Sequence, residues 1–305
     1  MNAARLGIDV GGSALKLGCT DADGEILGEE SVDVGSRPEL DALLGEVAQK
    51  ARKIHPTFAG VGLGLPGLLD RGQGRVEKSP NLPWLEQRPV REMAARALDL
   101  PAERVLVEND ANVAALAEQW RGAARHASNA LIATLGTGIG GGLILDGRLY
   151  TGEGMAGEVG HLVIDPEGPL CGCGRHGCLE QYASASAARR RAGAAGLPQD
   201  RPGDLEHLTE LAKKSPGPER KLLEEVGRDL GHGFALVVSL LDVRTFVVGG
   251  GFGRALPLLL PGIRRGLSEW AYGERVESLQ VLPAELEARA GWVGAARLVD
   301  LHLKA

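Results

Sequence analysis

Apolar positions near the start of the chain fall into short runs separated by turn residues. The stretch LGIDVGGSALKLG (residues 6–18) has two strand-like halves joined by a pair of glycines. The turn sequence Asp23-Gly24 follows, and the apolar Ile26 and Leu27 open a third run. Strands joined by such short turns predict an antiparallel meander, because a tight turn reverses the direction of the chain.

A second stretch has the same order of apolar runs and turns. The sequence LIATLGTGIGGGLILDG (residues 131–147) holds two apolar runs around turn glycines, ends in an Asp-Gly turn, and leads into Arg148, Leu149 and Tyr150. Two copies of one supersecondary pattern are typical of internal duplication. We therefore predict a duplicated α/β unit, with one copy in each of two lobes.

The segments around and after the second copy alternate between helical and strand-like patterns. A short apolar strand at 104–108 leads into an alanine- and leucine-rich helix at 111–120. Pro218 suits the first position of a further helix. The apolar positions that follow it at helical spacing are Leu222, Val226, Leu230, Val237 and Leu241. A strand at 245–250 comes next, and glycine and proline in 201–218 predict a surface insertion.

The end of the chain shows one more helical face, and the length of the whole chain fits two lobes. The apolar positions of this face are Trp292, Ala295, Ala296, Val299 and Leu303. We expect this terminal helix to pack on a core and to return to the first lobe. A chain of 305 residues is long for one core, and the usual scaling predicts two lobes of ~150 residues with a cleft between them.

Composition and charge narrow the class of protein. Hydrophobic residues make up 44% and charged residues 24%, as in ordinary globular proteins. The net charge of -6, the isoelectric point near 5.7 and the lack of a basic stripe argue against a nucleic acid partner. The start of the chain shows no signal sequence, and no apolar run is long enough to span a membrane. With four cysteines, too few for a secreted disulfide framework, we expect a cytoplasmic protein without a membrane partner.

The first glycine turn has the chemistry of a phosphate site without being a P-loop. Its glycines join two strands, and the lysine does not follow a glycine as a P-loop lysine does. Gly11 and Gly12 leave backbone N–H groups open to an anion, Ser13 adds a hydroxyl donor and Lys16 a positive charge. Asp9 is placed to hold a magnesium ion through water.

Two further glycine turns are candidates for the same kind of ligand. The residues Gly136, Thr137 and Gly138 of the second copy could grip another phosphate from the opposite side. The residues Gly249, Gly250 and Gly251 follow a buried strand and are predicted to precede a helix, where an adenosine or its phosphates would fit. Plain hairpins and a plain strand-to-helix turn are the alternatives. The two facing copies favour a nucleotide.

Asp110 lies where the strand at 104–108 passes into the helix at 111–120. A carboxylate at this joint would be kept ionised by the helix dipole, which suits a general base. Asp and Asn are also favoured residues for capping a helix, so a purely structural role for Asp110 is the alternative.

Three of the four cysteines lie in CGCGRHGC, residues 171–178. A disulfide between Cys171 and Cys173 would be strained, and no Cys-x-x-Cys redox pair is present. Three thiolates, including Cys178, and one imidazole fit a closed tetrahedral zinc site, with His161 or His176 as the fourth ligand. Such a closed site leaves no position for a catalytic water, which favours a structural zinc over a zinc hydrolase. Cys19 is predicted to be buried in a strand.

Six motifs together carry a family resemblance that covers nearly the whole chain. They are DVGGSALK at 9–16, GLPG at 64–67, ENDAN at 108–112, LGTGIGGG at 135–142, GEVGH at 157–161 and CGCGRHGCLE at 171–180. In this order they resemble the ROK family of sugar kinases and repressors, a branch of the actin-like, hexokinase-like ATPases. Within that family the chain is most similar to the bacterial glucokinases.

The resemblance implies a fold and its division. It implies an α/β protein of the two-lobed actin-like ATPase fold, built from duplicated ribonuclease H-like domains. The first lobe would comprise residues 1–109, with the terminal helix at 291–305 packed back on it. Residues 110–290 would form a larger lobe with a zinc-binding loop. The lobes of such proteins close on a sugar and MgATP, and the family is usually a homodimer or homotetramer.

The resemblance also assigns roles to single residues. It makes Asp110 the general base and Asn109 its sugar-binding neighbour. It makes Glu158, His161 and Glu180 the groups that bind the sugar hydroxyls, with Asn81 of SPNLPW as a further sugar contact. It favours His161 as the fourth ligand of the structural zinc beside the three cysteines. The thiol cluster then acts as a clamp that holds His161 and Glu180 at the sugar.

The implied activity is ATP-dependent phosphorylation of glucose to glucose 6-phosphate. The residues leave alternatives open: N-acetylglucosamine, N-acetylmannosamine, mannose or fructose as acceptor, polyphosphate as donor, a non-catalytic sugar sensor, and, more remotely, the zinc hydrolase. Repressors of the family carry a helix-turn-helix domain before the first phosphate turn. Here that turn begins at Asp9, which leaves no room for such a domain, so we expect a kinase.

Overall fold

The computed structural model describes residues 3–36, 39–197 and 205–303. The chain forms two compact units. The first unit comprises Met1–Arg125, Leu149–Ala156 and Leu286–Ala305, and the second comprises His126–Arg148 and Gly157–Glu285. The first lobe was predicted to end at residue 109, whereas the first segment of the first unit continues to Arg125.

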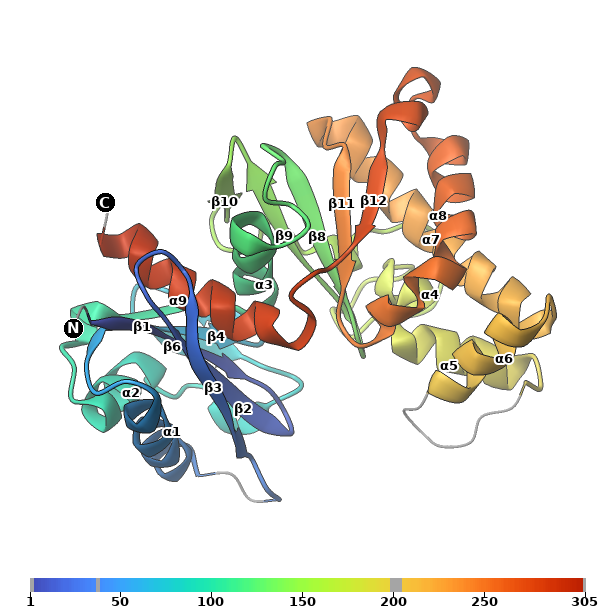
Figure 1. Cartoon of the computed structure of the whole chain (residues 1–305). Helices are drawn as coiled ribbons and strands as arrows, with labels where there is room; N and C mark the ends of the chain where they lie inside the picture. Colours follow the sequence, from blue (N-terminus) through green and yellow to red (C-terminus); the bar gives the residue numbers. More distant parts are fainter. Residues whose placement is uncertain (1–2, 37–38, 198–204, 304–305) are drawn as a thin grey trace. The chain divides into compact units, whose positions relative to one another are not determined.

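The first unit is built on a five-stranded sheet of order β3-β2-β1-β4-β7 (Figure 1). The strands are β1 (Ala4–Val10), β2 (Ala14–Thr20), β3 (Ile26–Asp33), β4 (Phe58–Leu65) and β7 (Val105–Asn109). β1, β2 and β3 pair antiparallel, and β4 and β7 continue the sheet in parallel. The meander predicted at the start of the chain is confirmed.

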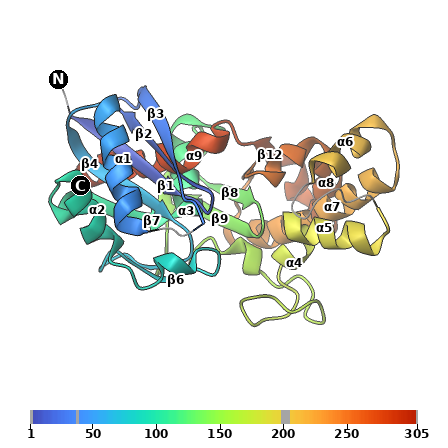
Figure 2. The ribbon, with the colours of Figure 1, turned by 90° about the horizontal axis from the view of Figure 1, so that it is seen from below.

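Helices cover both faces of the first sheet, because successive strand residues point to opposite sides. The helices are α1 (Leu40–Ile54), α2 (Val90–Leu98), α3 (Asp110–Arg121) and α9 (Ala290–Leu303). Leu6 and Ile8 join the core under α1 and α2, whereas Gly7 faces α9. Seen from below, α1 and α2 lie in front of the sheet and α9 behind it (Figure 2).

α9 lies directly on the backbone of β1 and β4. A β-carbon built on Gly7 would stand 1.8 Å from the carbonyl oxygen of Trp292, and one on Gly62 would stand 1.9 Å from that of Ala295. Only glycine fits at such distances, so these two positions let the helix seat itself on the sheet. Trp292 is buried there, with 2% of its surface exposed. The predicted terminal helix is therefore present and packs within the first unit, but Leu303 of the predicted apolar face is exposed.

Short elements complete the first unit. They are the hairpin of β5 (Leu68–Asp70) and β6 (Arg75–Lys78) and the 3-10 helices η1 (Pro83–Leu85), η2 (Ala102–Arg104) and η6 (Glu287–Arg289). The hairpin precedes η1. The turn between its two strands begins at Arg71, whose side chain donates a hydrogen bond to Glu108 near the end of β7.

The second unit repeats the strand order of the first. Its sheet runs β10-β9-β8-β11-β12, with β8 (Ala130–Leu135), β9 (Ile139–Leu145), β10 (Arg148–Tyr150), β11 (Thr245–Gly249) and β12 (Gln280–Pro283). β8 and β9 pair antiparallel, and β11 and β12 are parallel to β8. Two sheets with one strand order confirm the predicted α/β fold and the duplication.

The helices of the second unit enclose its core. They are α4 (Glu180–Ala183), α5 (Ala185–Ala194), α6 (Glu206–Lys214), α7 (Pro218–Leu241) and α8 (Leu256–Trp270), with the 3-10 helices η3 (Val159–His161), η4 (Phe252–Ala255) and η5 (Gly273–Ser278). α7 starts at Pro218 as predicted and packs along α8. The rings of Phe234 and Phe246 stack 4.6 Å apart between α7 and the sheet.

The predicted surface insertion at 201–218 is a helix where it is described. Its residues 201–204 lie outside the described residues, and α6 occupies most of the remainder.

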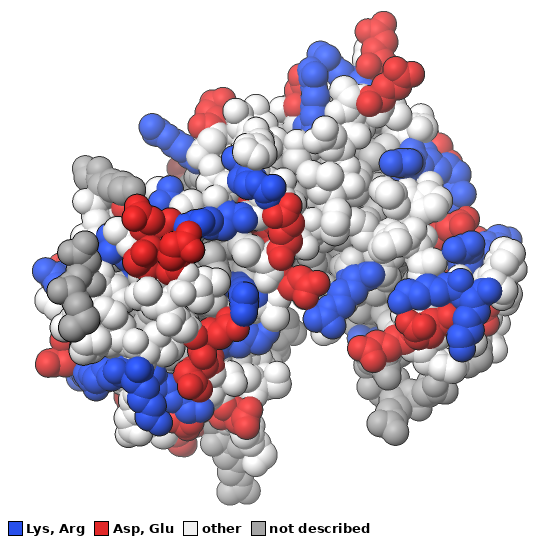
Figure 3. All heavy atoms as spheres, viewed as in Figure 1, with Lys and Arg blue, Asp and Glu red and all other residues white. Residues whose placement is uncertain are grey.

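Acidic and basic side chains are interleaved on the face shown in Figure 3. Among the described residues, no helix combines the length and the apolar character that a membrane span requires.

Candidate active site and thiol cluster

Asp110 is the first residue of α3, and Asn109 caps this helix. The Asn109 side-chain oxygen accepts hydrogen bonds from the backbone N–H of Ala111 at 2.9 Å and of Asn112 at 3.3 Å. The capping role that the sequence offered to Asp110 therefore belongs to its neighbour. The Asp110 side chain is exposed, and its Oδ1 also accepts from the N–H of Ala111 at 2.9 Å. The helix N-terminus favours its ionised form.

One residue beside Asp110 was missed by the sequence analysis. Glu108, at the end of β7, is buried and forms an ion pair with Arg71. The motif ENDAN contains this glutamate, but its position at the end of a strand gives no sign of the partner, which lies 37 residues earlier.

The first glycine turn joins β1 to β2. The N–H of Gly11 donates to the carbonyl of Ala14 at 3.1 Å, and Gly12 and Ser13 are exposed. Lys16 stands opposite Asp9 on the neighbouring strand. Burial raises the pKa of Asp9, and the charge of Lys16 acts in the opposite direction.

The Asp9 carboxylate also lies against the first residues of α9. A β-carbon built on Gly291, the second residue of α9, would stand 2.5 Å from the Asp9 Oδ2 atom. The terminal helix therefore brings its N-terminus, where positive backbone dipoles gather, against this carboxylate. The predicted roles of Asp9, Gly11, Gly12, Ser13 and Lys16 toward phosphate and magnesium stay predictions.

The second glycine turn lies against Glu180. The N–H of Gly136 donates to the carbonyl of Gly138 at 3.0 Å, and Thr137 between them is exposed. A β-carbon on Gly138 would stand 2.6 Å from the Glu180 Oε2 atom, whereas one on Gly136 would meet nothing within 4 Å. The two glycines therefore differ, since only Gly138 leaves room for a neighbouring carboxylate.

The third glycine turn follows β11 as predicted, but α8 does not start there. Gly250 has a φ of 81°, and a β-carbon on it would stand 2.4 Å from the carbonyl oxygen of Leu135. Gly251 precedes the 3-10 helix η4, and α8 begins only at Leu256. The helix N-terminus predicted at these glycines is therefore displaced by one short turn. A role of Gly249, Gly250 and Gly251 toward adenosine stays a prediction.

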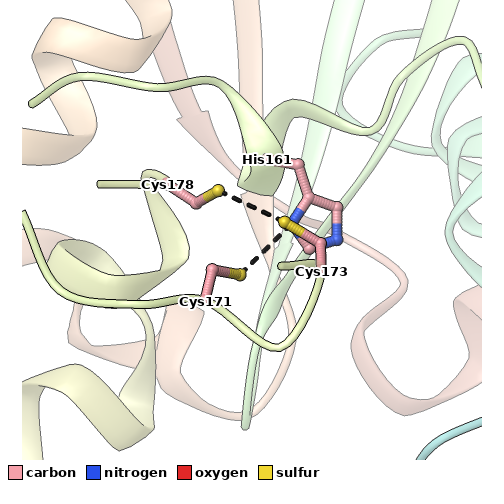
Figure 4. Close-up of side chains that lie close together, drawn as sticks. All are labelled: His161, Cys171, Cys173 and Cys178. Carbon is pink, nitrogen blue, oxygen red and sulfur yellow. Dashed lines mark hydrogen bonds between the residues drawn. The ribbon is translucent and has the colours of Figure 1, made fainter. Parts of the chain in front are cut away.

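The four predicted zinc ligands lie together in the second unit (Figure 4). Their ligand atoms lie within 4.8 Å of one another. The Cys171 Sγ atom is 3.6 Å from the His161 Nδ1 atom, and the Sγ atoms of Cys173 and Cys178 are 3.5 Å apart. His161 ends η3, and the cysteines come from the following loop, in which Cys178 pairs with Val163 in an isolated bridge.

These distances fit a tetrahedral metal site. With Zn–S bonds of about 2.3 Å, the ligands of a tetrahedral zinc ion lie roughly 3.8 Å apart. His176, the nearer candidate in the sequence, is exposed and has its Nδ1 atom 2.9 Å from the carbonyl oxygen of Gly168 instead. All the cysteines are free thiols, so the cluster is not a disulfide.

The pKa values of the clustered thiols are shifted in different directions by their surroundings. Burial raises the pKa of Cys171 to about 12, whereas a backbone hydrogen bond from Arg175 lowers the pKa of Cys173. A bound cation would deprotonate them, because a metal ion stabilises thiolates. Cys19 in β2 is fully buried as predicted, and burial raises its pKa to about 12.

The residues predicted to bind sugar fall into both units. Glu180, the first residue of α4, has its Oε1 atom 2.9 Å from Cys171 Sγ and 3.9 Å from His161 Nδ1. Glu158 precedes η3 and is exposed. In the first unit, Asn81 is exposed in the turn before η1. The structure thus brings His161 and Glu180 together with the thiols.

Two α/β units with one strand order and glycine turns between their first strands define a protein of the actin-like ATPase fold. The family model described as the ROK family matches residues 5–301. The chain belongs to the ROK family.

Several known proteins are similar over almost the full chain. A glucokinase of Streptomyces coelicolor is 37% identical, covering 96% of each chain. The structure of a ROK hexokinase from Thermus thermophilus matches with a TM-score of 0.82 and 35% identity over 99% of both chains. That of a ROK glucokinase from Streptomyces griseus, in complex with glucose and AMPPNP, has a TM-score of 0.81 and 34% identity over 97% of this chain and 99% of its own. A xylose repressor of Bacillus subtilis is 28% identical over 97% of this chain and 77% of its own.

Proposed function

We propose that the protein phosphorylates glucose with ATP to give glucose 6-phosphate, with Asp110 as the general base. The observation that carries this proposal is local. Asn109 caps α3, so Asp110 is left at the first helical position with an exposed carboxylate. An exposed carboxylate at the first turn of a helix, whose charge the helix dipole stabilises, is suited to accept a proton.

Phosphoryl transfer requires little covalent chemistry from the protein itself. The sugar hydroxyl must attack the γ-phosphate in line, its proton must find an acceptor, and the charge on the phosphates must be neutralised. Asp110 takes the proton in our proposal. The exposed backbone of Gly12 and Ser13 and that of Thr137 and Gly138 supply N–H donors to the phosphates, and Asp9 binds the magnesium ion of MgATP through water.

Sugar recognition is assigned to carboxylates, an imidazole and amides. Paired polar side chains bind adjacent hydroxyls and strongly reject analogues that lack one, because buried polar groups are then left unpaired. We assign this role to Glu158, His161 and Glu180 of the second unit and, in the first unit, to Asn81 and Asn109. The Asn109 amide nitrogen also donates to the carbonyl of Gly67 at 3.3 Å.

The thiol cluster is proposed to bind a structural zinc ion. His161, Cys171, Cys173 and Cys178 fill the four positions of a tetrahedral ion, which leaves none for water. The ion would cross-link the loop that leads into α4, and Glu180, the first residue of α4, follows the ligand Cys178 by two positions.

Similarity to glucokinases supports glucose over other sugars. Separately, the kinase relative matches at higher identity than the xylose repressor, which favours a kinase over a sensor. Another hexose, namely N-acetylglucosamine, N-acetylmannosamine, mannose or fructose, and polyphosphate as donor remain the alternatives within the kinases. The repressor relative favours one candidate of another class, a sugar sensor without catalysis. A cytoplasmic location and a homodimer or homotetramer are part of the proposal.

A coupled assay on a sugar panel tests this function. Purified protein is given MgATP or polyphosphate with glucose and each of the four alternative sugars, and the product is measured. We expect glucose with ATP to give the highest kcat/KM. A different preferred sugar or donor would move the proposal within the kinases, and sugar binding without any turnover would replace it with the sensor.

A further inference from the structure

The carboxylate of Glu108 is buried immediately before the candidate base. Only 6% of the residue is exposed, and it lies near the end of β7, two positions before Asp110. An isolated carboxylate in such a place would be costly, so a charged partner with good hydrogen-bond geometry is required.

Arg71 supplies that partner from the turn after β5. Its Nε atom donates to the Glu108 Oε2 atom at 2.8 Å, and its Nη2 atom donates to Oε1. This bidentate ion pair fixes the plane of the carboxylate and compensates its charge.

The same carboxylate binds the backbone and side chains on both sides of Asp110. Its Oε1 atom accepts from the backbone N–H of Asn109 at 2.8 Å and from the Asn112 side-chain nitrogen at 2.9 Å. Asn112 is itself buried, with 3% exposed. Glu108 therefore ties the residue before Asp110 to the first turn of the helix after it.

Arg71 is braced in turn by the first unit. Arg91 donates to the carbonyl oxygens of Arg71 at 2.6 Å and of Gly72 at 2.7 Å. The Nη1 atom of Arg71 donates to the carbonyl of Gly154 at 3.3 Å. The ion pair thus connects the N-terminus of α3 to a turn whose own position is fixed.

We propose that Glu108 and Arg71 are positioning residues for Asp110: together they set the place of its carboxylate without touching the reacting atoms. This inference rests on the proposed function. Glu108 is too buried to meet a sugar, and its hydrogen bonds bracket Asp110 on both sides. A base displaced by about 1 Å can lose roughly 10²-fold in rate, so an arrangement that prevents this displacement has a kinetic effect.

Conservative variants test the positioning role. In Arg71→Lys the charge stays but the bidentate geometry is lost, and in Glu108→Gln the shape stays but the charge is lost. We expect kcat to fall about 10- to 100-fold, while KM for glucose and for ATP changes less than about threefold. Arg5→Lys is the matched control, because Arg5 pairs at 2.7 Å with Asp300, another buried carboxylate of the first unit, 1% exposed. Its kcat should stay at the wild-type value.

A double-mutant cycle separates positioning from general damage. In the Asp110→Asn background, Arg71→Lys should lower the residual turnover by less than about twofold, because the base through which it acts is gone. Equal losses in both backgrounds would overturn the proposal. A drop in kcat in Arg5→Lys as large as in Arg71→Lys would also overturn it.

Amide hydrogen exchange gives a readout that needs no activity. In Arg71→Lys and Glu108→Gln, exchange should accelerate at the Ala111 and Asn112 amides while those of α9 stay protected. If the wild type turns over no sugar, the proposed function fails, but this measurement still decides whether the pair holds the turn. Unchanged exchange at Ala111 and Asn112 would overturn the positioning role itself. If Glu108→Gln does not fold, Arg71→Lys carries the test.

Discussion

The two units share one strand order but hold their candidate functional residues by different means. In the first unit, Asp110 follows directly on β7 and begins α3, and its surroundings are fixed by backbone hydrogen bonds and the Glu108–Arg71 pair. In the second unit, His161 and Glu180 frame a loop without regular helix or strand, which carries the three clustered cysteines.

The difference shows what each solution requires. A residue at the junction of a strand and a helix takes its direction from regular backbone and needs only local polar contacts. An irregular loop of this length lacks that support, and a bound metal ion is one way to provide it. We therefore expect damage around Asp110 to lower the rate and damage to the thiol cluster to weaken sugar binding.

Loss of the proposed base should have the largest effect. Asp110→Asn removes the proton acceptor and keeps the size of the side chain, so we expect kcat to fall by about 10²- to 10⁴-fold. The measurement is the coupled assay at saturating glucose and MgATP. Turnover at the wild-type level would exclude Asp110 as the base.

Loss of a cluster thiol should come next. Cys178→Ser removes one sulfur ligand, and we expect the bound zinc to fall from about one per chain toward zero. KM for glucose should rise about 10- to 100-fold, as when groups that support a functional site are lost, with KM for ATP affected less. Cys19→Ser is the control, because Cys19 lies in β2 outside the cluster.

Metal analysis and kinetics on both variants decide this prediction. The clamp is refuted if wild-type protein is fully active without zinc. It is also refuted if ATP binding weakens before sugar binding does.

A pair of glycines in one turn offers a smaller test. In Gly138→Ala the new methyl group would stand 2.6 Å from the Glu180 Oε2 atom, so the carboxylate must move. Gly136→Ala meets nothing within 4 Å and serves as the matched control. We expect KM for glucose to rise roughly tenfold in the first variant and less than twofold in the second. Equal effects would show that the position of Glu180 does not matter.

The smallest expected effect is on the pH dependence of the free energy of unfolding. Burial raises the pKa of Asp9 above its ordinary value of 3.8. Its protonated form therefore favours the folded state at low pH, and this contribution is lost as pH rises through the raised pKa. Asp9→Asn should gain stability relative to wild type over that rise and keep the gain at pH 7. Urea unfolding of both proteins between pH 4 and 7 measures the difference, and a constant difference would contradict the pKa shift.

Local patterns predicted much of the fold, because strand alternation and helical spacing report which face is buried. The meander at 6–27, its repeat at 131–150 and the helix after Pro218 are all present. The short η4 before α8 was not predicted, since a glycine-rich turn gives no sign of how soon a helix begins.

The candidate site was predictable where its residues are close in sequence. The cysteines lie within eight residues of one another, and the structure brings His161 to them. The choice of cap at Asn109 was not predictable, because Asn and Asp cap helices equally well. The contacts of Arg71 with Glu108 and of Gly138 with Glu180 were not predictable for another reason, since they depend on tertiary packing alone.

Glucose titration by calorimetry, with Asp110→Asn and Cys178→Ser side by side, tests the division of roles between Asp110 and the thiol cluster most directly. We expect Asp110→Asn to bind glucose within about threefold of the wild-type Kd although its turnover is lost, and Cys178→Ser to bind it at least about tenfold more weakly. Loss of glucose binding in Asp110→Asn, together with wild-type binding in Cys178→Ser, would contradict this account.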